Sequence, residues 1–442
     1  MIDRAVLLNS CARLLDCGES AIGGTWTHHG AAPLMSMESL ILMLAQSLTG
    51  LTVLDFGQLI AGPVCGMWLA DMGATVIKIE PPDGELARRL GPPWQNGESL
   101  TALTANRNKL ALSIDLKRPE AGRVIRRLVE RADVVLENFR PGVTTRLGID
   151  HAALSAVKPD LITCSLSAYG QIGPWSGRPG VDGIIQAVTG LMAGISAPDG
   201  GPGKVPLPLA DMTGALFATV AVLAALRRRD ATGEGGHLDV SLYNSMLMLQ
   251  QLNLAAYLNS GAVPEPTGSA APYAAVNEAL PTRDGWIMVA AYQDRRWQAL
   301  CALIGRPDLV ADPRFATNAG RVAERPALLA VLQPIFRQRT SAEWLPLLRE
   351  ADIVAAPVAD YAEVAGTEQY TASGIEIELD HPRAGRFRMP GFALGTAGAA
   401  RPSAPPPLTG QDSRVVLQRF GFTEADVDAL VSDAVVFTGA TS

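Results

Sequence analysis

The fold of this chain is decided by LTVLDFGQLIAGPVCGMWLADMGATVIKIE, residues 51–80. The short apolar run 51–56 predicts a strand, 62–73 predicts a helix that ends at Gly73, and 74–80 predicts a second strand. A strand, a helix and a strand in such close succession are typical of a βαβ unit, in which the two strands run parallel.

The same alternation continues along the chain. Apolar runs at 109–116, 133–139 and 160–170 predict further strands, and the amphipathic segment 118–132 predicts a helix. Strands that are apolar throughout are buried on both faces of a sheet. We therefore expect an α/β fold with a Rossmann-like large domain, whose parallel sheet is covered by helices on both faces.

Segments rich in Pro, Gly and Ala suggest how the chain is divided. At 442 residues the chain is long enough for two domains. The expected divisions are an N-terminal extension of unknown role (1–50), a large domain (51–258), a linker (259–275), a smaller α+β domain (276–360), a second linker (361–374) and a C-terminal part (375–442). A short strand and one long apolar helix are expected within 232–258, and a helix is possible at 36–48.

Composition and missing motifs exclude several classes of protein. The net charge of −7 argues against nucleic-acid or anionic-membrane partners, and the five scattered cysteines indicate free thiols in a reducing compartment, so we expect a cytoplasmic protein. The uncharged run from Met212 to Leu226 is shorter than the roughly 20 residues that cross a bilayer. G-x-G-x-x-G, P-loop and G-x-S-x-G motifs are absent, and the five histidines lack metal-ligand spacing, so we expect no metal.

One carboxylate stands at the head of an uncharged stretch of fifteen residues. In PLPLADMTGALFATVAVLAAL, residues 206–226, Asp211 directly precedes that run. Asp is a good N-cap residue, and its charge is stabilised by the positive end of a helix dipole. A catalytic carboxylate would use the same geometry, but for the residue taken alone the N-cap is the simpler interpretation.

Several phrases, in this order and spacing, carry a resemblance. They are LDFGQLIAGP (54–63), ATVIKIEPPDGELARRLGPP (74–93), NRNKLALSIDLKRPEA (106–121), ADVVLENFRPGVTTRLGI (132–149), PLADMTGALFA (208–218), TRDGWIMVAAYQDRRWQALCALIGRPDL (282–309) and PPLTGQDSRVVLQRFGF (406–422). Together they resemble the family III CoA-transferases of the CaiB/BaiF type, whose superfamily includes the α-methylacyl-CoA racemases. The resemblance covers about residues 51–435.

The resemblance implies a function and an architecture. Asp211 matches the family's nucleophile, which accepts acyl and CoA groups in turn while CoA moves from an acyl-CoA to a small carboxylic acid; the start of its helix would help to keep it ionised. CoA is then a substrate, and no permanently bound cofactor is expected. The family also implies that the C-terminal part returns to the large domain and that two ring-shaped chains interlock as a homodimer.

The resemblance further implies a set of CoA-binding positions: Gln58, Ala61, Arg88, Lys109, Ile114, Asn138, Phe139 and Arg146. Gln58 and Ala61 match positions at the pantetheine and thioester end of CoA, and Ile114 matches an apolar position near the adenine. For the basic residues, an ordinary solvated surface position is about as plausible as a phosphate contact. Pro81 and Pro82 stand where some relatives have a basic residue, so part of their phosphate clamp must differ here.

Three alternatives stay open at this point. The racemase branch needs a histidine base, and Val181 occupies that position, which argues for transfer over racemisation. Asp182 follows it and has a structural explanation in both branches. A catalytically silent acyl-CoA-binding protein is the second alternative, and retention of Asp211 argues against it. A nicotinamide-dependent dehydrogenase is the third, and it lacks the glycine fingerprint.

Overall fold

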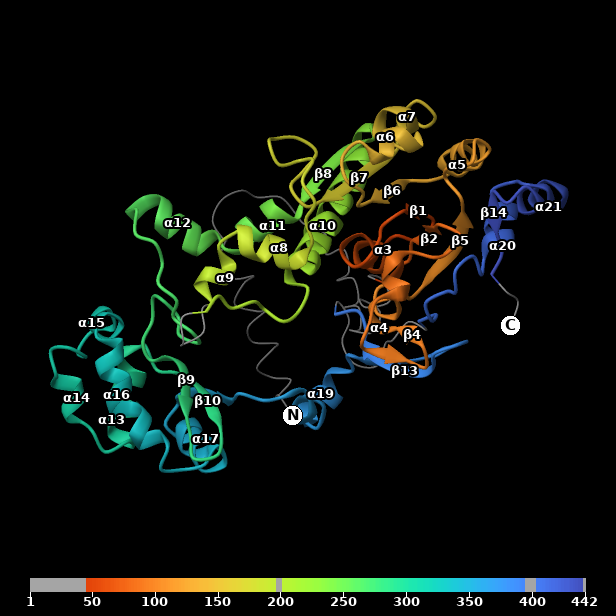
Figure 1. Ribbon diagram of the computed structural model, residues 1–442. Coiled ribbons are helices and arrows are strands. Elements are labelled where there is room, and N and C mark those ends of the chain that lie inside the picture. The colour runs from red at the N-terminus through yellow and green to blue at the C-terminus, as the bar shows by residue number, and fades with distance from the viewer. Residues whose placement is uncertain (1–44, 196–200, 394–402, 440–442) are drawn as a thin grey trace, which may run out of the picture. The chain divides into compact units, whose positions relative to one another are not determined.

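The computed structural model describes residues 45–195, 201–393 and 403–439. Its largest sheet has seven strands in the order β14-β5-β2-β1-β6-β7-β8 (Figure 1). These strands are β1 (Thr52–Asp55), β2 (Thr75–Glu80), β5 (Lys109–Ile114), β6 (Val134–Glu137), β7 (Ile162–Ser167), β8 (Gly236–Ser241) and β14 (Val436–Phe437). Each of the strands expected from the apolar runs is present, with ends that are shorter by a few residues.

All pairings in this sheet are parallel except one. β1 lies between β2 and β6, and the parallel order continues to β5 on one side and to β7 and β8 on the other. β14 pairs antiparallel with the end of β5, where Val436 faces Ile114. The prediction of an α/β fold with a mostly parallel sheet is confirmed, and the C-terminal part supplies the antiparallel edge strand.

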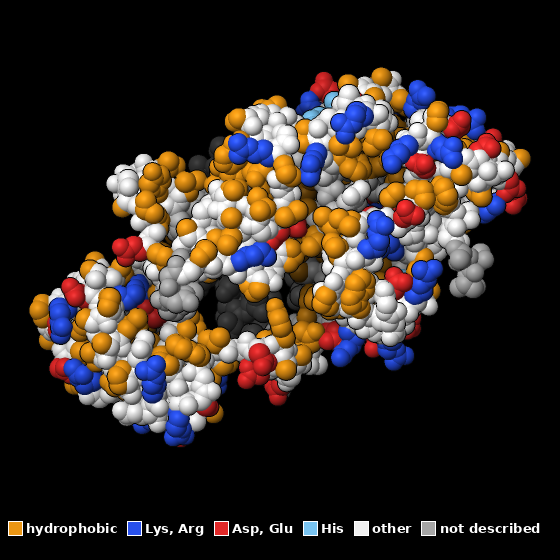
Figure 2. Space-filling view, in the orientation of Figure 1, with side chains coloured by type: hydrophobic (Ala, Val, Ile, Leu, Met, Phe, Trp, Pro, Cys, Tyr) orange, Lys and Arg blue, Asp and Glu red, His pale blue; other side chains and the backbone are white. Residues whose placement is uncertain are grey.

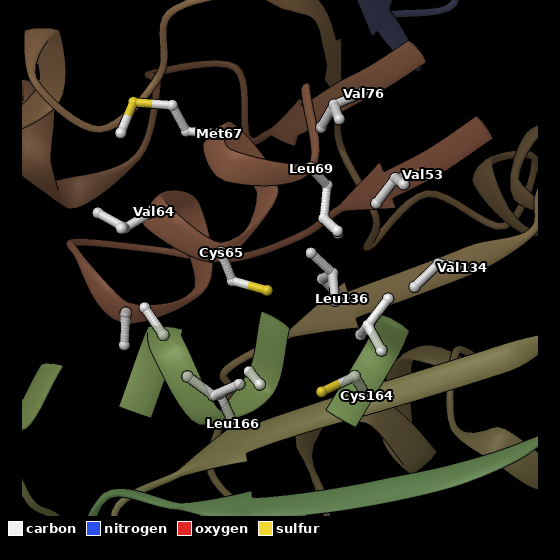
Figure 3. Close-up of a cluster of buried hydrophobic side chains, with 14 of the residues drawn as sticks. Val53, Val64, Cys65, Met67, Leu69, Val76, Val134, Leu136, Cys164 and Leu166 are labelled. Carbon is white, nitrogen blue, oxygen red and sulfur yellow. The ribbon is translucent and has the colours of Figure 1, made fainter. Parts of the chain in front are cut away.

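Two hydrophobic cores cover the two faces of the sheet. Successive strand residues such as Val53 and Leu54 belong to different cores, because side chains alternate across a strand. On one face α3 and α10 pack on the strands, and Figure 3 shows Cys65 and Leu69 of α3 among side chains of β1, β6 and β7. On the other face the strands are covered by α5, α20 and α21. The strand runs are apolar because both faces are buried.

The helices associated with this sheet are α3 (Ala61–Asp71), η1 (Leu86–Arg89), α4 (Leu100–Leu103), α5 (Ala121–Val129), α6 (Val143–Leu147), α7 (His151–Ser155), α8 (Asp182–Val188), α9 (Leu191–Gly194), α10 (Leu209–Thr232), α11 (Leu242–Leu249), α12 (Gln251–Ser260), α20 (Ser413–Arg419) and α21 (Glu424–Ser432). Among the described residues, α10 alone has the length and apolar composition of a membrane-crossing helix. Its residues Ala215, Ala218 and Val222 are fully buried in the core beside α3. The core explains this buried side of α10, whereas Leu216 and Val220 on the same helix are 53% and 55% exposed.

A second, three-stranded antiparallel sheet has the order β11-β10-β9 and a core of its own. Its strands are β9 (Asn277–Pro281), β10 (Trp286–Ala290) and β11 (Val354–Pro357), and its helices are α13 (Asp294–Leu303), α14 (Asp308–Ala311), α15 (Asn318–Ala323), α16 (Arg325–Phe336) and α17 (Ser341–Glu350). Two hairpins, β3 (Trp94–Gln95) with β4 (Glu98–Ser99) and β12 (Glu376–His381) with β13 (Gly385–Pro390), contact each other through the Asn96 amide and the Ala384 carbonyl at 2.8 Å.

Some local predictions need correction. The long apolar helix expected up to residue 258 is two helices, α11 and α12, because the backbone leaves helical geometry at Gln250 and its side chain bonds the carbonyl oxygens of Thr189 and Met246. The segment 361–374 contains α18 (Tyr361–Ala365) and α19 (Glu368–Ser373), and its role as a linker stays a prediction. Most of the expected helix at 36–48, and most of the N-terminal extension, lie outside the described residues.

Candidate active site

The start of α3 and the start of α10 lie at the same edge of the large sheet. α3 follows β1 directly, so it begins at the carboxyl end of the strands. α10 ends just before β8, which runs parallel to β7, so α10 must run back across the sheet and begin at that same edge. Residues from the first turns of both helices belong to one hydrophobic core. In open α/β sheets this is the edge where ligands bind.

Asp211 lies in the first turn of α10, but it is not the N-cap. The N-cap is Pro208, and Asp211 is the third helical residue. The interpretation of Asp211 as a cap is therefore wrong. The Ala210 N–H instead donates to Oδ1 of Asp182, at 2.8 Å. Because Asp182 already accepts the N–H of the second helical residue, the Asp211 side chain does not cap that group.

The Asp211 carboxyl lies in surroundings that favour its neutral form. Burial raises the pKa of Asp211 to about 7; the charge of Asp182 adds to the rise, and Lys204 opposes it. Among the described residues, none donates a hydrogen bond to this carboxylate. The helix start was expected to keep Asp211 ionised, whereas burial and the charge of Asp182 act in the opposite direction and raise its pKa.

Asp182 is the better satisfied of the two carboxylates. Its Oδ2 accepts a hydrogen bond from Gln186 at 2.9 Å and lies 3.3 Å from the Lys204 ammonium. Sequence reasoning missed the role of this residue at the start of α10, because Asp182 and Ala210 are 28 residues apart and no spacing motif links them. Val181, which precedes Asp182, is the N-cap of α8 and is exposed.

The structure places Lys109 and Ile114 inside the protein. The Lys109 ammonium donates to Asp55 Oδ2 at 2.8 Å and to the Pro63 carbonyl at 2.7 Å, and its side chain has no exposed surface. Burial lowers the pKa of Lys109 to about 8, against the effect of Asp55. Ile114 is 1% exposed and lies in the core beside β14. Both side chains are buried in the described structure, and their contact with CoA stays a prediction.

The Arg88 guanidinium is also bonded to other groups of the protein. Its guanidinium makes two parallel hydrogen bonds of 2.8 Å to the Glu80 carboxylate and a third, of 2.9 Å, to the Pro407 carbonyl. It lines a small polar cavity of about 240 Å³ together with Asp83, Glu98 and Arg383. The two guanidinium groups in this lining are matched by two carboxylates, so the lining has no excess of positive charge that would attract a phosphate.

The remaining predicted positions surround the carboxyl ends of β1 and β6. Ala61 is the first residue of α3 and is buried. Gln58 and Asn138 are half-buried and bonded to each other, and Phe139 packs partly against the core behind β6. Arg146 lies in the last turn of α6, and its side chain is exposed. Figure 2 shows basic side chains on the surface around α5 and α6. Of the predicted basic residues, Arg146 is the most accessible.

A wider hollow opens at the same edge of the sheet. A cavity of about 460 Å³ lies at the carboxyl ends of β7 and β8, and its lining includes Tyr169, Trp175, Tyr243 and Asn244. Three aromatic rings pack edge-to-face or tilted in its wall, with ring centroids 5.5 to 6.1 Å apart. A carboxylate of raised pKa, the turn after β1 and an aromatic hollow therefore all lie at this edge of the sheet.

Comparison with known proteins decides the family. The model of CoA-transferase family III matches residues 48–413. The chain belongs to this family. It is similar to the succinyl-CoA:glutarate CoA-transferase of Mus musculus, with 31% identity over 99% of this chain and 98% of that protein. The acetyl-CoA:oxalate CoA-transferase of Acetobacter aceti is 35% identical over 80% of this chain and 92% of its own.

A solved structure of a CaiB/BaiF family protein from Brucella suis has a similar fold. Its TM-score is 0.73 at 33% identity, over 84% of this chain and 99% of that one. The resemblance drawn from the sequence phrases is confirmed, and the protein is an enzyme, a family III CoA-transferase that acts on CoA thioesters.

Proposed function

We propose that this enzyme moves CoA from an acyl-CoA thioester to a free carboxylic acid through covalent intermediates on Asp211. The observation that carries the proposal is the Asp211 carboxyl itself. It lies at the ligand-binding edge of the sheet, its pKa is raised to about 7 by burial and by Asp182, and no described residue donates a hydrogen bond to it. A carboxylate with little solvation and no fixed partner is a better nucleophile than a solvated one.

The proposed steps conserve every acyl and CoA group. An Asp211 oxygen attacks the thioester carbonyl carbon, the C–S bond breaks, and CoA thiolate leaves behind a mixed anhydride. The thiolate then attacks the Asp211 carbonyl carbon, which releases the donor acid and forms an aspartyl-CoA thioester. The acceptor carboxylate repeats the sequence in reverse, so that CoA leaves on the acceptor and Asp211 is regenerated as a carboxylate.

We propose short dicarboxylic acids as acceptors. The similar enzymes from Mus musculus and Acetobacter aceti are named for glutarate and oxalate as acceptors and for succinyl-CoA and acetyl-CoA as donors. A panel of these four compounds, with products separated by mass spectrometry, is therefore the first assay to perform. A racemase activity would appear as α-proton exchange of a 2-methylacyl-CoA in deuterated water, which we expect to be absent because Val181 carries no proton.

The decisive experiment combines variants with a chemical trap. Asp211→Ala and Asp211→Asn should lower kcat by about 10³-fold or more, because neither side chain forms the anhydride. Asp230→Ala, at the exposed far end of α10, is the matched control and should leave kcat unchanged. Wild-type enzyme held with donor and no acceptor should react with hydroxylamine at Asp211, on the peptide between Lys204 and Arg227. Wild-type rates in Asp211→Ala would overturn the proposal.

We further propose a homodimer, formed by interlocking of the divided large domain (51–258 and 375–442) and the small domain (276–360). The strongest support is α12, a helix of 10 residues of which none is buried. Its side chains Leu252 and Leu258 are 59% and 71% exposed, and hydrophobic side chains reach the surface around α12 in Figure 2. Such an exposed apolar patch is typical of an interface. Light scattering should give the mass of two chains, and a monomer at micromolar concentration would contradict this.

The expected cytoplasmic location rests on the thiols. The described cysteines, Cys65, Cys164 and Cys301, are free and buried. Free thiols are typical of a reducing compartment, and we propose the cytoplasm on this ground.

A further inference from the structure

The turn between β1 and α3 is held by side chains from several strands. Across the turn, the Gln58 N–H donates to Asn138 Oδ1 at 2.7 Å, and Asn138 Nδ2 donates back to the Gln58 carbonyl at 2.8 Å. A single amide side chain thus satisfies both backbone groups of Gln58. Asn138 comes directly after β6, so this clamp links the carboxyl ends of two adjacent strands.

The residues on either side of Gln58 are held in the same manner. The Gly57 N–H donates to Asp55 Oδ1 at 2.7 Å, and the Gly57 carbonyl accepts a hydrogen bond from Lys78. The Leu59 N–H donates to Glu85 Oε2 at 2.8 Å. Every backbone N–H from Gly57 to Leu59 therefore bonds a side chain.

The backbone of this turn is also confined sterically. Leu59 has φ +65°, a left-handed conformation that is uncommon for a residue with a side chain and needs support from its surroundings. The first turn of α3 approaches so closely that a Cβ on Gly62 would lie 2.9 Å from the Gly57 Cα. The Glu85 bond and this close contact restrict the turn to one geometry.

This arrangement differs from a dinucleotide-binding turn in a way that bears on function. There, the N–H groups after the first strand are free and bind a pyrophosphate at the switch point of the sheet. Here the switch point lies between β1 and β6, and Asn138 bridges it. The N–H groups of Gly57, Gln58 and Leu59 are all used. The Gln58 carboxamide is a free polar group of this turn, since no described residue is its hydrogen-bond partner.

We propose that Asn138 and Glu85 are positioning residues that fix the backbone of the turn, so that the Gln58 carboxamide meets the bound thioester in one orientation. This inference rests on the proposed function. It reassigns Asn138, expected from the resemblance to contact CoA, to a role that acts through Gln58. It also states that the turn presents the Gln58 carboxamide to the substrate and that the backbone N–H groups of Gly57, Gln58 and Leu59 bind no phosphate.

The test is a double-mutant cycle. Asn138→Ala and Asn138→Asp should lower kcat by about 10-fold or more, because small displacements of a positioning group are costly. In the Gln58→Ala background the same changes should lower kcat by less than about 2-fold, since residues that act through one another are not additive. Glu85→Gln keeps an acceptor for the Leu59 N–H and should restore most of the kcat that is lost in Glu85→Ala.

Asn318 provides a matched control outside the site. It makes the same kind of two-bond clamp, accepting from the Ala275 N–H at 3.1 Å and donating to the Tyr273 carbonyl at 3.0 Å. Asn318→Ala should lower the melting temperature about as much as Asn138→Ala and leave kcat within about 2-fold of wild type. This comparison separates a loss of stability from a loss of positioning.

The outcomes distinguish this inference from the proposed function. Equal fold-losses for the Asn138 changes with and without Gln58 would overturn the inference, because Asn138 would then act on CoA directly. A raised KM for acyl-CoA with unchanged kcat would overturn it for the same reason. Absence of CoA transfer by the wild-type enzyme would overturn the proposed function and, with it, the inference. If Asn138→Ala fails to fold, Asn138→Asp and Glu85→Ala, each with and without Gln58→Ala, give the same readouts.

Discussion

Two aspartates at the same edge of one sheet have pKa values that are shifted in opposite directions. Asp55, at the end of β1, is fully buried, and burial alone would raise its pKa, but Lys109 and Lys78 outweigh burial and lower it. Asp211, at the start of α10, has a pKa of about 7, because its burial is reinforced by Asp182 and only opposed by Lys204. Of these two buried carboxylates, the one that supports the fold is held as a stable anion, and the one where we place the chemistry is left poorly compensated.

The largest expected effect on stability tests the structural aspartate. Lys109→Met removes the nearest cation and leaves the Asp55 charge buried, which should lower the free energy of unfolding by about 3–5 kcal/mol. Lys117→Met, at an exposed position, should change it by less than about 0.5 kcal/mol. Urea denaturation of both variants measures the difference. Similar values for the two would mean that Asp55 is not held as an anion by Lys109.

The opposite sign is expected for the candidate nucleophile. At pH 8 Asp211→Asn should raise the free energy of unfolding by about 1–3 kcal/mol, because a poorly compensated buried charge is removed. The folded-state pKa of Asp211 lies above its unfolded value of about 4, so wild-type stability falls as the pH rises from about 4 to about 7. The advantage of the variant should grow over that window and level off above it. A variant that is less stable at pH 8 would contradict the assigned pKa shift.

A third prediction concerns the pH profile of activity. If ionised Asp211 is the nucleophile, kcat/KM should rise with pH through about 7. Asp182→Asn removes the neighbouring charge. It should move this rising limb of the kcat/KM profile to lower pH by up to about one unit. Asp230→Asn, at the other end of the same helix, should leave the limb in place. A limb that does not move in Asp182→Asn would show that burial alone sets the pKa of Asp211.

The smallest effect is expected at the surface. Arg146→Ala should raise KM for acyl-CoA by about 3- to 10-fold and leave kcat unchanged, as expected for an exposed phosphate contact. The increase should shrink at high salt because exposed charges are screened. Arg126→Ala, on the exposed face of α5, is the control and should leave KM unchanged. An unchanged KM in Arg146→Ala would remove Arg146 from the CoA site.

Much of the molecule could be predicted from local patterns. Apolar runs such as 74–80 and 109–116 mark strands that are buried on both faces, and their alternation with helices is sufficient to predict a parallel sheet. Phrases in a fixed order indicated the family and drew attention to Asp211. These features depend on residues close together in the sequence, where spacing and side-chain type carry the information.

Contacts between distant segments could not be predicted. Lys109 and Arg88 are basic residues in suitable phrases, yet the fold brings Asp55 and Glu80 beside them and turns both into internal ion pairs. Asp211 has the sequence position of a helix cap, but Asp182 bonds the start of α10 from another helix. Charge and hydrogen-bonding capacity are local properties, whereas the identity of the partner depends on how the strands are ordered.

The sequence by itself determined the class of fold, the family and the residue types available for chemistry, because hydrophobic period and motif order are written along the chain. Only the tertiary structure decided which of those residues are free to act. It paired Asn138 with the backbone of Gln58 across 80 residues, and it placed Asp182 near Asp211 so that the pKa of Asp211 rises. Desolvation and pairing are properties of the packed molecule, since both depend on which groups exclude water from each other.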